Sequence, residues 1–160
     1  MKCEVRNNLL FVDGQPIEYL QAADHGGEMA PDLIVIHYTG DNSLEGGLGE
    51  LTSPGGREVS AHLVIAKDGT VYQLLPFNVV GWHAGKSNYY GQEWVNRFSI
   101  GIENVGFGDN WPDAQVEANR AIIAALFDAY PIRDVVGHQD VAPGRKPDPG
   151  PNFPWDKVTA

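Results

Sequence analysis

The sequence predicts an α/β fold in which helices flank one central, mixed β-sheet. Residues 32–40, DLIVIHYTG, begin with an apolar run of the kind found in strands covered on both faces. Residues 59–76 hold two β-rich runs around a tight turn, which indicates an antiparallel hairpin. Residues 113–130 carry a helical pattern between two short strand patterns, an order typical of α/β sheets. The length fits one domain, and we expect it over residues 1–160, with a core from about 20 to 155 and a hairpin in 1–20.

The chain begins with a hairpin and a central strand. In residues 9–20, LLFVDGQPIEYL, Asp13 and Gly14 have the residue types of a tight hairpin turn. The run from Leu33 to Ile36 shows no alternation with polar residues, so it suits a buried strand. His37 is then expected at or near the point where that strand ends.

The middle of the chain combines a short helix, a hairpin and another strand. Residues 42–53, NSLEGGLGELTS, indicate a short helix capped by Asn42 or Ser43, although its glycines lower the helix propensity. The turn KDGT at 67–70 is a strong hairpin signal. The segment FSIGIENVG predicts a short, buried strand with Glu103 near its end.

A long amphipathic helix follows, and one more short strand comes after it. Asp113 is acidic in the first turn, and Pro131 ends the helix. Asn119 is the one polar exception on the apolar face. The residues of that face recur with a period of 3.6, and they are Val116, Ile122, Ile123, Leu126, Phe127 and Tyr130. The segment RDVVGH then predicts a strand that leads into His138.

Composition excludes several classes of protein. With Cys3 as the only cysteine, neither an internal disulfide nor a thiolate zinc cluster is possible. The net charge of −10 argues against nucleic acid or membrane partners, which require basic patches. The chain has no apolar run of membrane-spanning length, and its N-terminus lacks the apolar core of a signal peptide. We therefore expect a cytoplasmic location by default; the oligomeric state is not readable from the sequence.

Two histidines occupy corresponding positions in the predicted sheet. The chain has five histidines, at positions 25, 37, 62, 83 and 138. His37 follows the run LIVI and His138 follows VVG, so each lies where a buried strand gives way to a loop. Functional sites of open α/β sheets gather at such strand ends. If the two strands are neighbours, both imidazoles can bind one metal ion.

The segment GHQDVAPGRKPDPGP, residues 137–151, supplies a candidate third ligand. Asp148 lies ten positions after His138, in a loop whose prolines restrict the backbone and whose glycines permit tight turns. A catalytic zinc site uses three protein ligands and leaves one position for water. The alternative is an ordinary surface turn, which the spacing alone favours because Asp, Pro and Gly are common turn residues.

Five segments run in order from about residue 20 to about residue 155. They are LIVIHYTG, VSAHLVIAKDGTVYQLLP, GWHAGKS, SIGIEN and VVGHQDVAPGRKPDPGPNFPW. Together they resemble the type 2 N-acetylmuramoyl-L-alanine amidases, zinc enzymes that share the fold of the peptidoglycan recognition proteins, and the recycling-type and phage-type amidases are the nearest in appearance. Five matching segments in order make this resemblance specific.

The resemblance implies roles for five residues. His37, His138 and Asp148 correspond to the zinc ligands of the family. Glu103 corresponds to the general base, which takes a proton from water and returns it to the leaving amine. Lys146 corresponds to a cation that stabilises the oxyanion. The residues alone favour the alternatives of an exposed strand terminus for Glu103 and a solvated loop lysine for Lys146.

Four further residues are candidate substrate contacts. Trp82 and His83 of the GWHAG segment are expected to line the groove, and Tyr38 follows a ligand. His62 begins a strand, and a core histidine is an equal alternative there. His25 lies in a predicted loop and receives no role.

The function implied is that of a zinc-dependent hydrolase with one Zn²⁺ per chain. Its substrate would be the amide between the lactyl group of N-acetylmuramic acid and L-alanine, in peptidoglycan or in muropeptides. One alternative is a non-catalytic peptidoglycan-binding module of the same fold, and another is a zinc hydrolase that cuts a different amide. The sequence leaves open whether the protein is a bacterial recycling enzyme or a phage endolysin released to the periplasm or cell wall.

Overall fold

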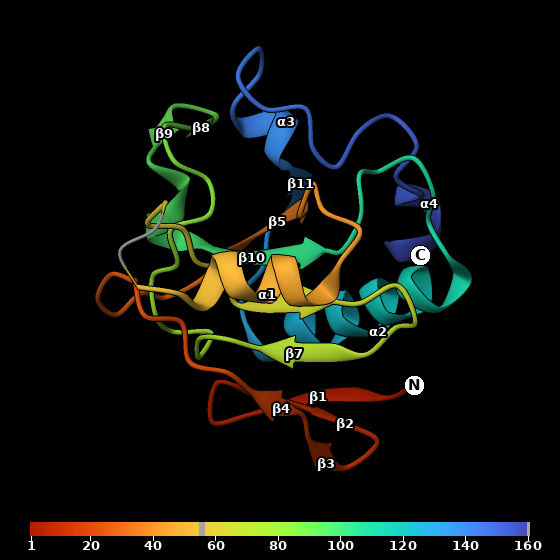
Figure 1. Ribbon diagram of the computed structural model, residues 1–160. Coiled ribbons are helices and arrows are strands. Elements are labelled where there is room, and N and C mark those ends of the chain that lie inside the picture. The colour runs from red at the N-terminus through yellow and green to blue at the C-terminus, as the bar shows by residue number, and fades with distance from the viewer. Residues whose placement is uncertain (55–56, 160) are drawn as a thin grey trace.

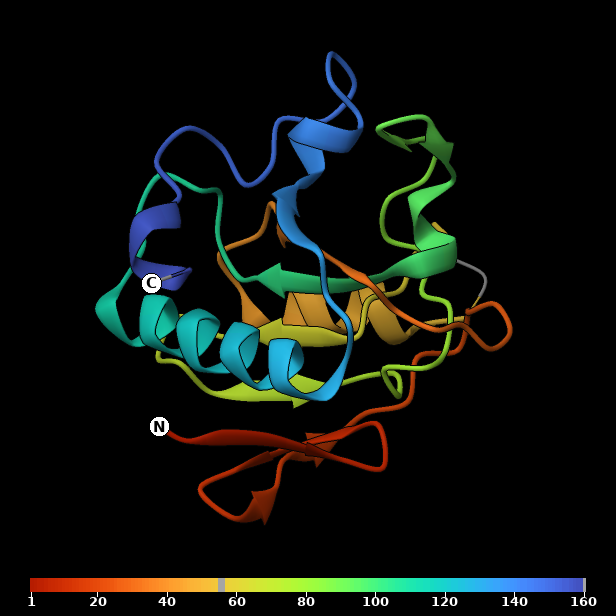
Figure 2. The same cartoon turned by 180° about the vertical axis from the view of Figure 1, so that it is seen from behind.

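The computed structural model describes residues 1–54 and 57–159 and has a six-stranded mixed sheet at its centre (Figures 1 and 2). The strand order is β11-β5-β10-β6-β7-β4. The strands of this sheet are β4 (Glu18–Tyr19), β5 (Leu33–Tyr38), β6 (Leu63–Ile65), β7 (Val71–Gln73), β10 (Ser99–Asn104) and β11 (Asp134–Gly137). Smaller sheets contain β1 (Cys3–Arg6), β2 (Leu9–Val12) and β3 (Gln15–Pro16), and separately β8 (Asn88–Tyr89) and β9 (Gln92–Glu93). The predicted α/β class is confirmed.

Helices cover both faces of the central sheet. Figure 1 shows α1 in front of the strands and α2 behind them, and Figure 2 shows the reverse view. The helices are α1 (Leu44–Thr52), the 3-10 helix η1 (Val95–Phe98), α2 (Asp113–Ala129), α3 (His138–Val141) and α4 (Trp155–Val158). The apolar side chains of α2 pack on one face of β5, β6 and β10, and those of α1 pack with Val64 and Leu74 on the other. No helix in the described part of the chain has both the length and the apolar character needed to cross a bilayer.

Three adjacent parallel strands at one side of the sheet, β11, β5 and β10, fix the register of the site. β5 lies between β10 and β11, and both neighbours run parallel to it. Glu103 is paired with His37 across β10 and β5. Gly137, the last residue of β11, is paired with Ile36. The next residue along each of these strands is therefore a histidine, so His37 and His138 emerge side by side at one edge.

The N-terminal region differs in part from the predicted hairpin. Asp13 and Gly14 form the turn between β2 and β3, with φ values of 50° and 80°. The chain after Pro16 leaves this hairpin, and β4 joins the central sheet beside β7. β1 adds a strand that the sequence pattern did not indicate, and its turn to β2 has two asparagines with positive φ. Asparagine tolerates this backbone region better than most residues, which explains the connection.

The polar exception in α2 has a structural explanation. Asn119 is fully buried and donates from Nδ2 to Asn104 Oδ1, at 2.7 Å. Asn104 in turn donates to the backbone carbonyl of His37, at 3.1 Å. Because buried polar groups are stable only when hydrogen-bonded, this pair fixes α2 against the strand end that carries His37.

Candidate metal centre and active site

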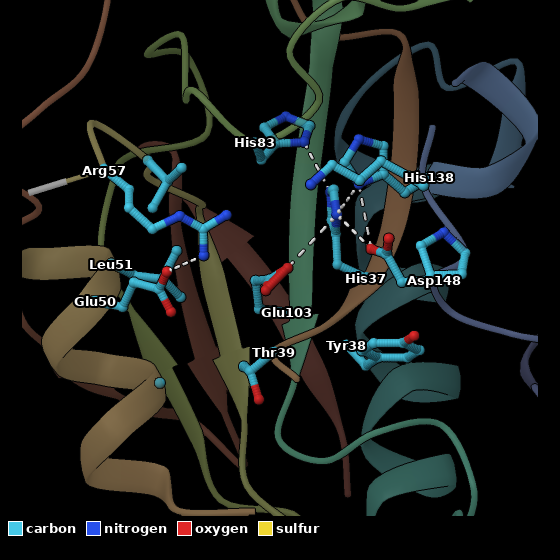
Figure 3. Close-up of a pocket in the computed structure, with 14 residues that line it drawn as sticks. His37, Tyr38, Thr39, Glu50, Leu51, Arg57, His83, Glu103, His138 and Asp148 are labelled. Atoms are coloured by element: carbon cyan, nitrogen blue, oxygen red, sulfur yellow. Dashed lines mark hydrogen bonds and ion pairs between the residues drawn. The ribbon is translucent and has the colours of Figure 1, made fainter. Parts of the chain in front are cut away.

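Three side chains from different elements converge at the carboxyl edge of the sheet. His37 comes from β5, His138 from the first position of α3, and Asp148 from the loop after α3 (Figure 3). Asp140 accepts a hydrogen bond from the backbone of Gly137 at 2.7 Å, which starts α3 directly after β11. Gln139 binds the loop: its backbone N–H donates to the carbonyl of Asp148 at 2.8 Å. The loop therefore brings Asp148 back to the end of β11, beside His138.

The three groups form a compact triangle suited to a metal ion. His37 Nδ1 lies 3.0 Å from His138 Nδ1 and 3.0 Å from Asp148 Oδ2, and the third edge is 3.2 Å. A tetrahedral zinc site with bonds of about 2.0–2.1 Å has ligand atoms about 3.3 Å apart, so the triangle fits. All three side chains are buried. The set could hold one divalent cation.

The outer ring nitrogens show which atoms are free to bind that ion. His138 Nε2 lies 2.9 Å from the carbonyl oxygen of Ala84, which only accepts, so Nε2 carries the proton. His138 Nδ1 then presents a lone pair to the triangle. His37 Nε2 lies 3.0 Å from His83 Nδ1, and donation from His37 leaves its Nδ1 free as well. Two imidazole lone pairs and a carboxylate oxygen repel one another unless a cation lies between them, which supports a metal site.

The electrostatics of the triangle favour a neutral His37 imidazole and an ionised Asp148 carboxylate. Burial lowers the pKa of His37, against the effect of the nearby Asp148 carboxylate. Burial raises the pKa of Asp148, but the two imidazoles beside it outweigh burial and hold that pKa well below the ordinary value. These are the protonation states in which histidine and aspartate bind metals.

Glu103 lies beside the triangle without being part of it. Its Oε1 is 3.5 Å from His37 Nδ1, and the side chain is almost fully buried. Burial raises the pKa of Glu103 well above the ordinary value, and the negative charge of Asp148 raises it further. A carboxyl group with a raised pKa accepts a proton more readily than an ordinary carboxylate does.

An open cavity of about 210 Å³ lies over these groups. Lys146 and Tyr38 line it from the side of the ligand loop and β5. The opposite wall comes from α1 and from Arg57 and Val59, and Glu50 of α1 forms an ion pair with Arg57 (Figure 3). The sequence did not indicate this wall, because no pattern in a short helix shows that it faces a site.

The expected substrate contacts have different outcomes. The expectation for His62 is wrong, because its side chain is fully buried and both ring nitrogens bind backbone groups of Val79 and Gly101. Among the described residues that line the cavity, Trp82 is absent, and its indole lies near Gly26. Tyr38 and His83 line the cavity, and their contact with a substrate stays a prediction. The ring nitrogens of His83, however, face His37 and Ser99.

Comparison with known proteins places these features in a family. The family model described as N-acetylmuramoyl-L-alanine amidase (Amidase_2) matches residues 27–151. The chain is 48% identical over 100 residues to the 1,6-anhydro-N-acetylmuramyl-L-alanine amidase AmpD of Escherichia coli K12, covering 61% of this chain and 55% of that protein. It is 36% identical over 145 residues to the protein of the same name from Haemophilus influenzae, covering 78% and 79%.

A solved structure supports the same relationship. A crystal structure of a Se-Met AmpD derivative superposes with a TM-score of 0.85 at 31% identity, and the match covers 96% of each chain. The sequence match spans only about half of the Escherichia coli relative. The family match, by contrast, includes the three converging side chains, Glu103 and Lys146. The chain belongs to the N-acetylmuramoyl-L-alanine amidase family.

Proposed function

We propose that the protein is a zinc-dependent hydrolase that cleaves the amide between the lactyl group of N-acetylmuramic acid and L-alanine. The observation that carries this proposal is the buried triangle of His37, His138 and Asp148 with Glu103 beside it. Two imidazoles and one carboxylate are a donor set typical of catalytic zinc, which keeps one position open. When bound, zinc supplies a Lewis acid that polarises the scissile carbonyl and makes water acidic enough to attack.

Glu103 is proposed as the group that moves the proton. It accepts a proton from the attacking water as the water oxygen bonds to the carbonyl carbon. It then delivers that proton to the alanine nitrogen as the C–N bond breaks, so that a free muramic carboxyl group and a free amine leave. The raised pKa of Glu103, caused chiefly by its burial, supports both halves of this transfer.

Lys146 and Tyr38 are proposed to act on the substrate from the walls of the cavity. Lys146 is half-buried and lines the cavity two positions before Asp148. A fixed cation there stabilises the negative charge that develops on the carbonyl oxygen. Tyr38 presents a partly exposed ring in the same cavity. We assign it contact with the sugar or with the first residues of the peptide.

Soluble anhydro-muropeptides are the substrates we propose. Relatives at 48% and 36% identity carry the name 1,6-anhydro-N-acetylmuramyl-L-alanine amidase. A net charge of −10 also disfavours adsorption of the protein to an anionic cell wall, and this favours soluble fragments over intact wall. The cytoplasmic location expected from the sequence belongs to the same proposal.

Mass analysis of products tests the proposal directly. The purified chain, with its zinc content measured, is incubated with a 1,6-anhydro-muropeptide and separately with purified peptidoglycan, each with and without chelator. We expect the free stem peptide and free anhydro-sugar, faster from the soluble substrate, and no products in chelator. Chelator-insensitive binding without cleavage would identify the protein as a binding module instead. A cut within the stem peptide would identify a different amide as the substrate.

A further inference from the structure

Two consecutive residues hold the outer nitrogens of both histidine ligands. His37 Nε2 lies 3.0 Å from the ring of His83, and His138 Nε2 lies 2.9 Å from the carbonyl oxygen of Ala84. The two ligands are 101 positions apart in the chain, yet one short segment sets the orientation of both rings. We call residues 83–86 the positioning segment.

The hydrogen bonds around His83 have a single consistent direction. Ser99 Oγ donates to the carbonyl of Val95 at 2.7 Å, so this oxygen is left to accept. His83 Nε2 lies 3.2 Å from Ser99 Oγ and 3.3 Å from the Ser99 carbonyl, and its proton has only acceptors to bind. His83 Nδ1 is then unprotonated and accepts from His37 Nε2. The chain of bonds therefore leaves His37 Nδ1 with the lone pair that faces the triangle.

The position of the His83 ring is also fixed by close packing. A Cβ atom at Gly101 would lie 2.5 Å from His83 Cγ, so the ring sits directly against the backbone of β10. The ring therefore has almost no freedom to turn.

The positioning segment is itself held from two sides. On one side, Asn96 Oδ1 accepts from the backbone N–H groups of His83 and Ala84, at 3.2 and 2.7 Å. On the other, the guanidinium of Arg145 donates to the carbonyls of Ala84 and Lys86, at 2.5 and 2.8 Å. Arg145 belongs to the loop that carries Asp148, so it connects the third ligand to the segment that orients the other two.

We propose that His83 and Arg145 are positioning residues that set the affinity of the site for its metal without touching the metal. His83 fixes the tautomer and ring angle of His37. Arg145 fixes the Ala84 carbonyl, which in turn fixes the ring of His138. Outer partners of this kind change metal affinity about 10–100-fold when they are removed. The inference rests on the metal-binding part of the proposed function and gives His83 a role in addition to the predicted substrate contact.

The first test compares two substitutions at His83 in the full chain. In His83→Asn the amide oxygen stands where Nδ1 accepts, and in His83→Leu no acceptor remains. Zn²⁺ affinity is measured by competition with a chromophoric chelator, and the unfolding temperature of each metal-free variant is measured in parallel. We expect His83→Leu to bind Zn²⁺ about 10–100-fold more weakly and His83→Asn to keep most of the affinity. Nitrogen-15 NMR should show His37 as the Nε2–H tautomer in the wild type and in His83→Asn.

Equal Zn²⁺ affinity in the two variants would overturn the role of His83, whatever their stability.

The second test removes Arg145, and Arg145→Ala should weaken Zn²⁺ binding about 10-fold. Arg145→Lys, which keeps one donor, should recover part of the loss. Arg120→Ala is the control, because Arg120 forms an exposed ion pair on α2 away from the site. Wild-type affinity in Arg145→Ala would remove Arg145 from the proposal.

Failure of this inference is distinguishable from failure of the proposed function. If His83→Leu and Arg145→Ala bind Zn²⁺ as tightly as the wild type and the wild type cleaves muropeptides, the positioning role is wrong and the function stands. If the wild type binds Zn²⁺ with the expected ranking of variants but cleaves nothing, the positioning role stands and the function is wrong. A wild-type chain that binds no Zn²⁺ would overturn both.

Discussion

Glu103 and His37 are direct neighbours across β10 and β5, and Glu103 Oε1 lies 3.5 Å from His37 Nδ1. The proposed base is therefore placed by strand register rather than by a loop. Because successive side chains of a strand point to opposite faces, a slip of one residue would turn Glu103 away from the cavity. The distance between the two groups is therefore set by the pairing of β10 with β5.

Glu103→Gln is expected to retain Zn²⁺ and to lose turnover by at least about 100-fold, since it keeps the shape but cannot accept the proton. The measurements are kcat on a muropeptide and the zinc content of the same preparation. Glu117→Gln, on the exposed surface of α2, should leave both unchanged. Near-wild-type turnover in Glu103→Gln would assign the base to another residue.

His138→Ala is expected to lose metal and activity together, because it removes one corner of a three-membered triangle. Zinc content after dialysis and the rate of product formation check this. His25→Ala is a matched control at an exposed histidine outside the site, and it should keep both properties. Unchanged zinc content in His138→Ala would exclude His138 as a ligand.

The stability of the metal-free protein should fall as the pH is lowered from 6.5 to 4, in part because of His62. Burial lowers the pKa of His62 from 6.5 to about 4 in the folded chain. His62 Nδ1 accepts a hydrogen bond from Gly101 N–H, so protonating Nδ1 would break that bond. Below pH 6.5 the unfolded chain binds a proton that the folded chain refuses until about pH 4. Protonation of His62 therefore costs no stability above pH 6.5. Between pH 6.5 and pH 4 it lowers the free energy of unfolding by about 3 kcal/mol.

Urea unfolding in chelator between pH 4 and pH 7 measures this loss. His62→Asn, which keeps an acceptor for Gly101, should show a shallower dependence on pH than the wild type. The comparison isolates His62, since the other buried histidines are present in both proteins. If the free energy of unfolding depends on pH in the same way in both proteins, His62 is not a source of the acid sensitivity.

Gly101→Ala should destabilise the protein by about 1–3 kcal/mol, because the added methyl would lie 2.5 Å from the His83 ring in a packed region. Gly49→Ala in α1 is the matched control. An added Cβ at Gly49 meets nothing within 4 Å, so alanine there should stabilise by about 0.5–1 kcal/mol. The free energy of unfolding in urea checks both changes. A Gly101→Ala protein with the free energy of unfolding of the wild type would show that the His83 ring is free to move.

The fold was predictable where apolar pattern and turn chemistry agree. The run before His37 indicated a buried strand, and the turn at 67–70 fixed the hairpin of β6 and β7. The short strands β8 and β9 and the one-turn helix α3 were not predicted, because polar pairs of two residues and four-residue helices have no periodicity to detect. Asn119 looked like a defect in a helical pattern, and only its partner Asn104 explains it.

The candidate site was predictable for a different set of reasons. His37 and His138 follow from strand ends, which the apolar runs locate. Asp148 does not follow from spacing, since a turn residue and a ligand look alike in the sequence; the family resemblance was needed. The different surroundings of His62 and His83 depend on tertiary contacts with β10 and with His37. No local pattern carries that information.

The wide separation of the ligands along the chain has a consequence for folding. The first histidine of the triangle precedes the second by 101 positions, and the two meet only after β11 has docked beside β5. A chain that has not yet added its final parallel strand has no metal pocket at all. Binding of the proposed zinc ion therefore requires β11 to be in place, and a zinc-sensitive dye would report when the sheet is complete.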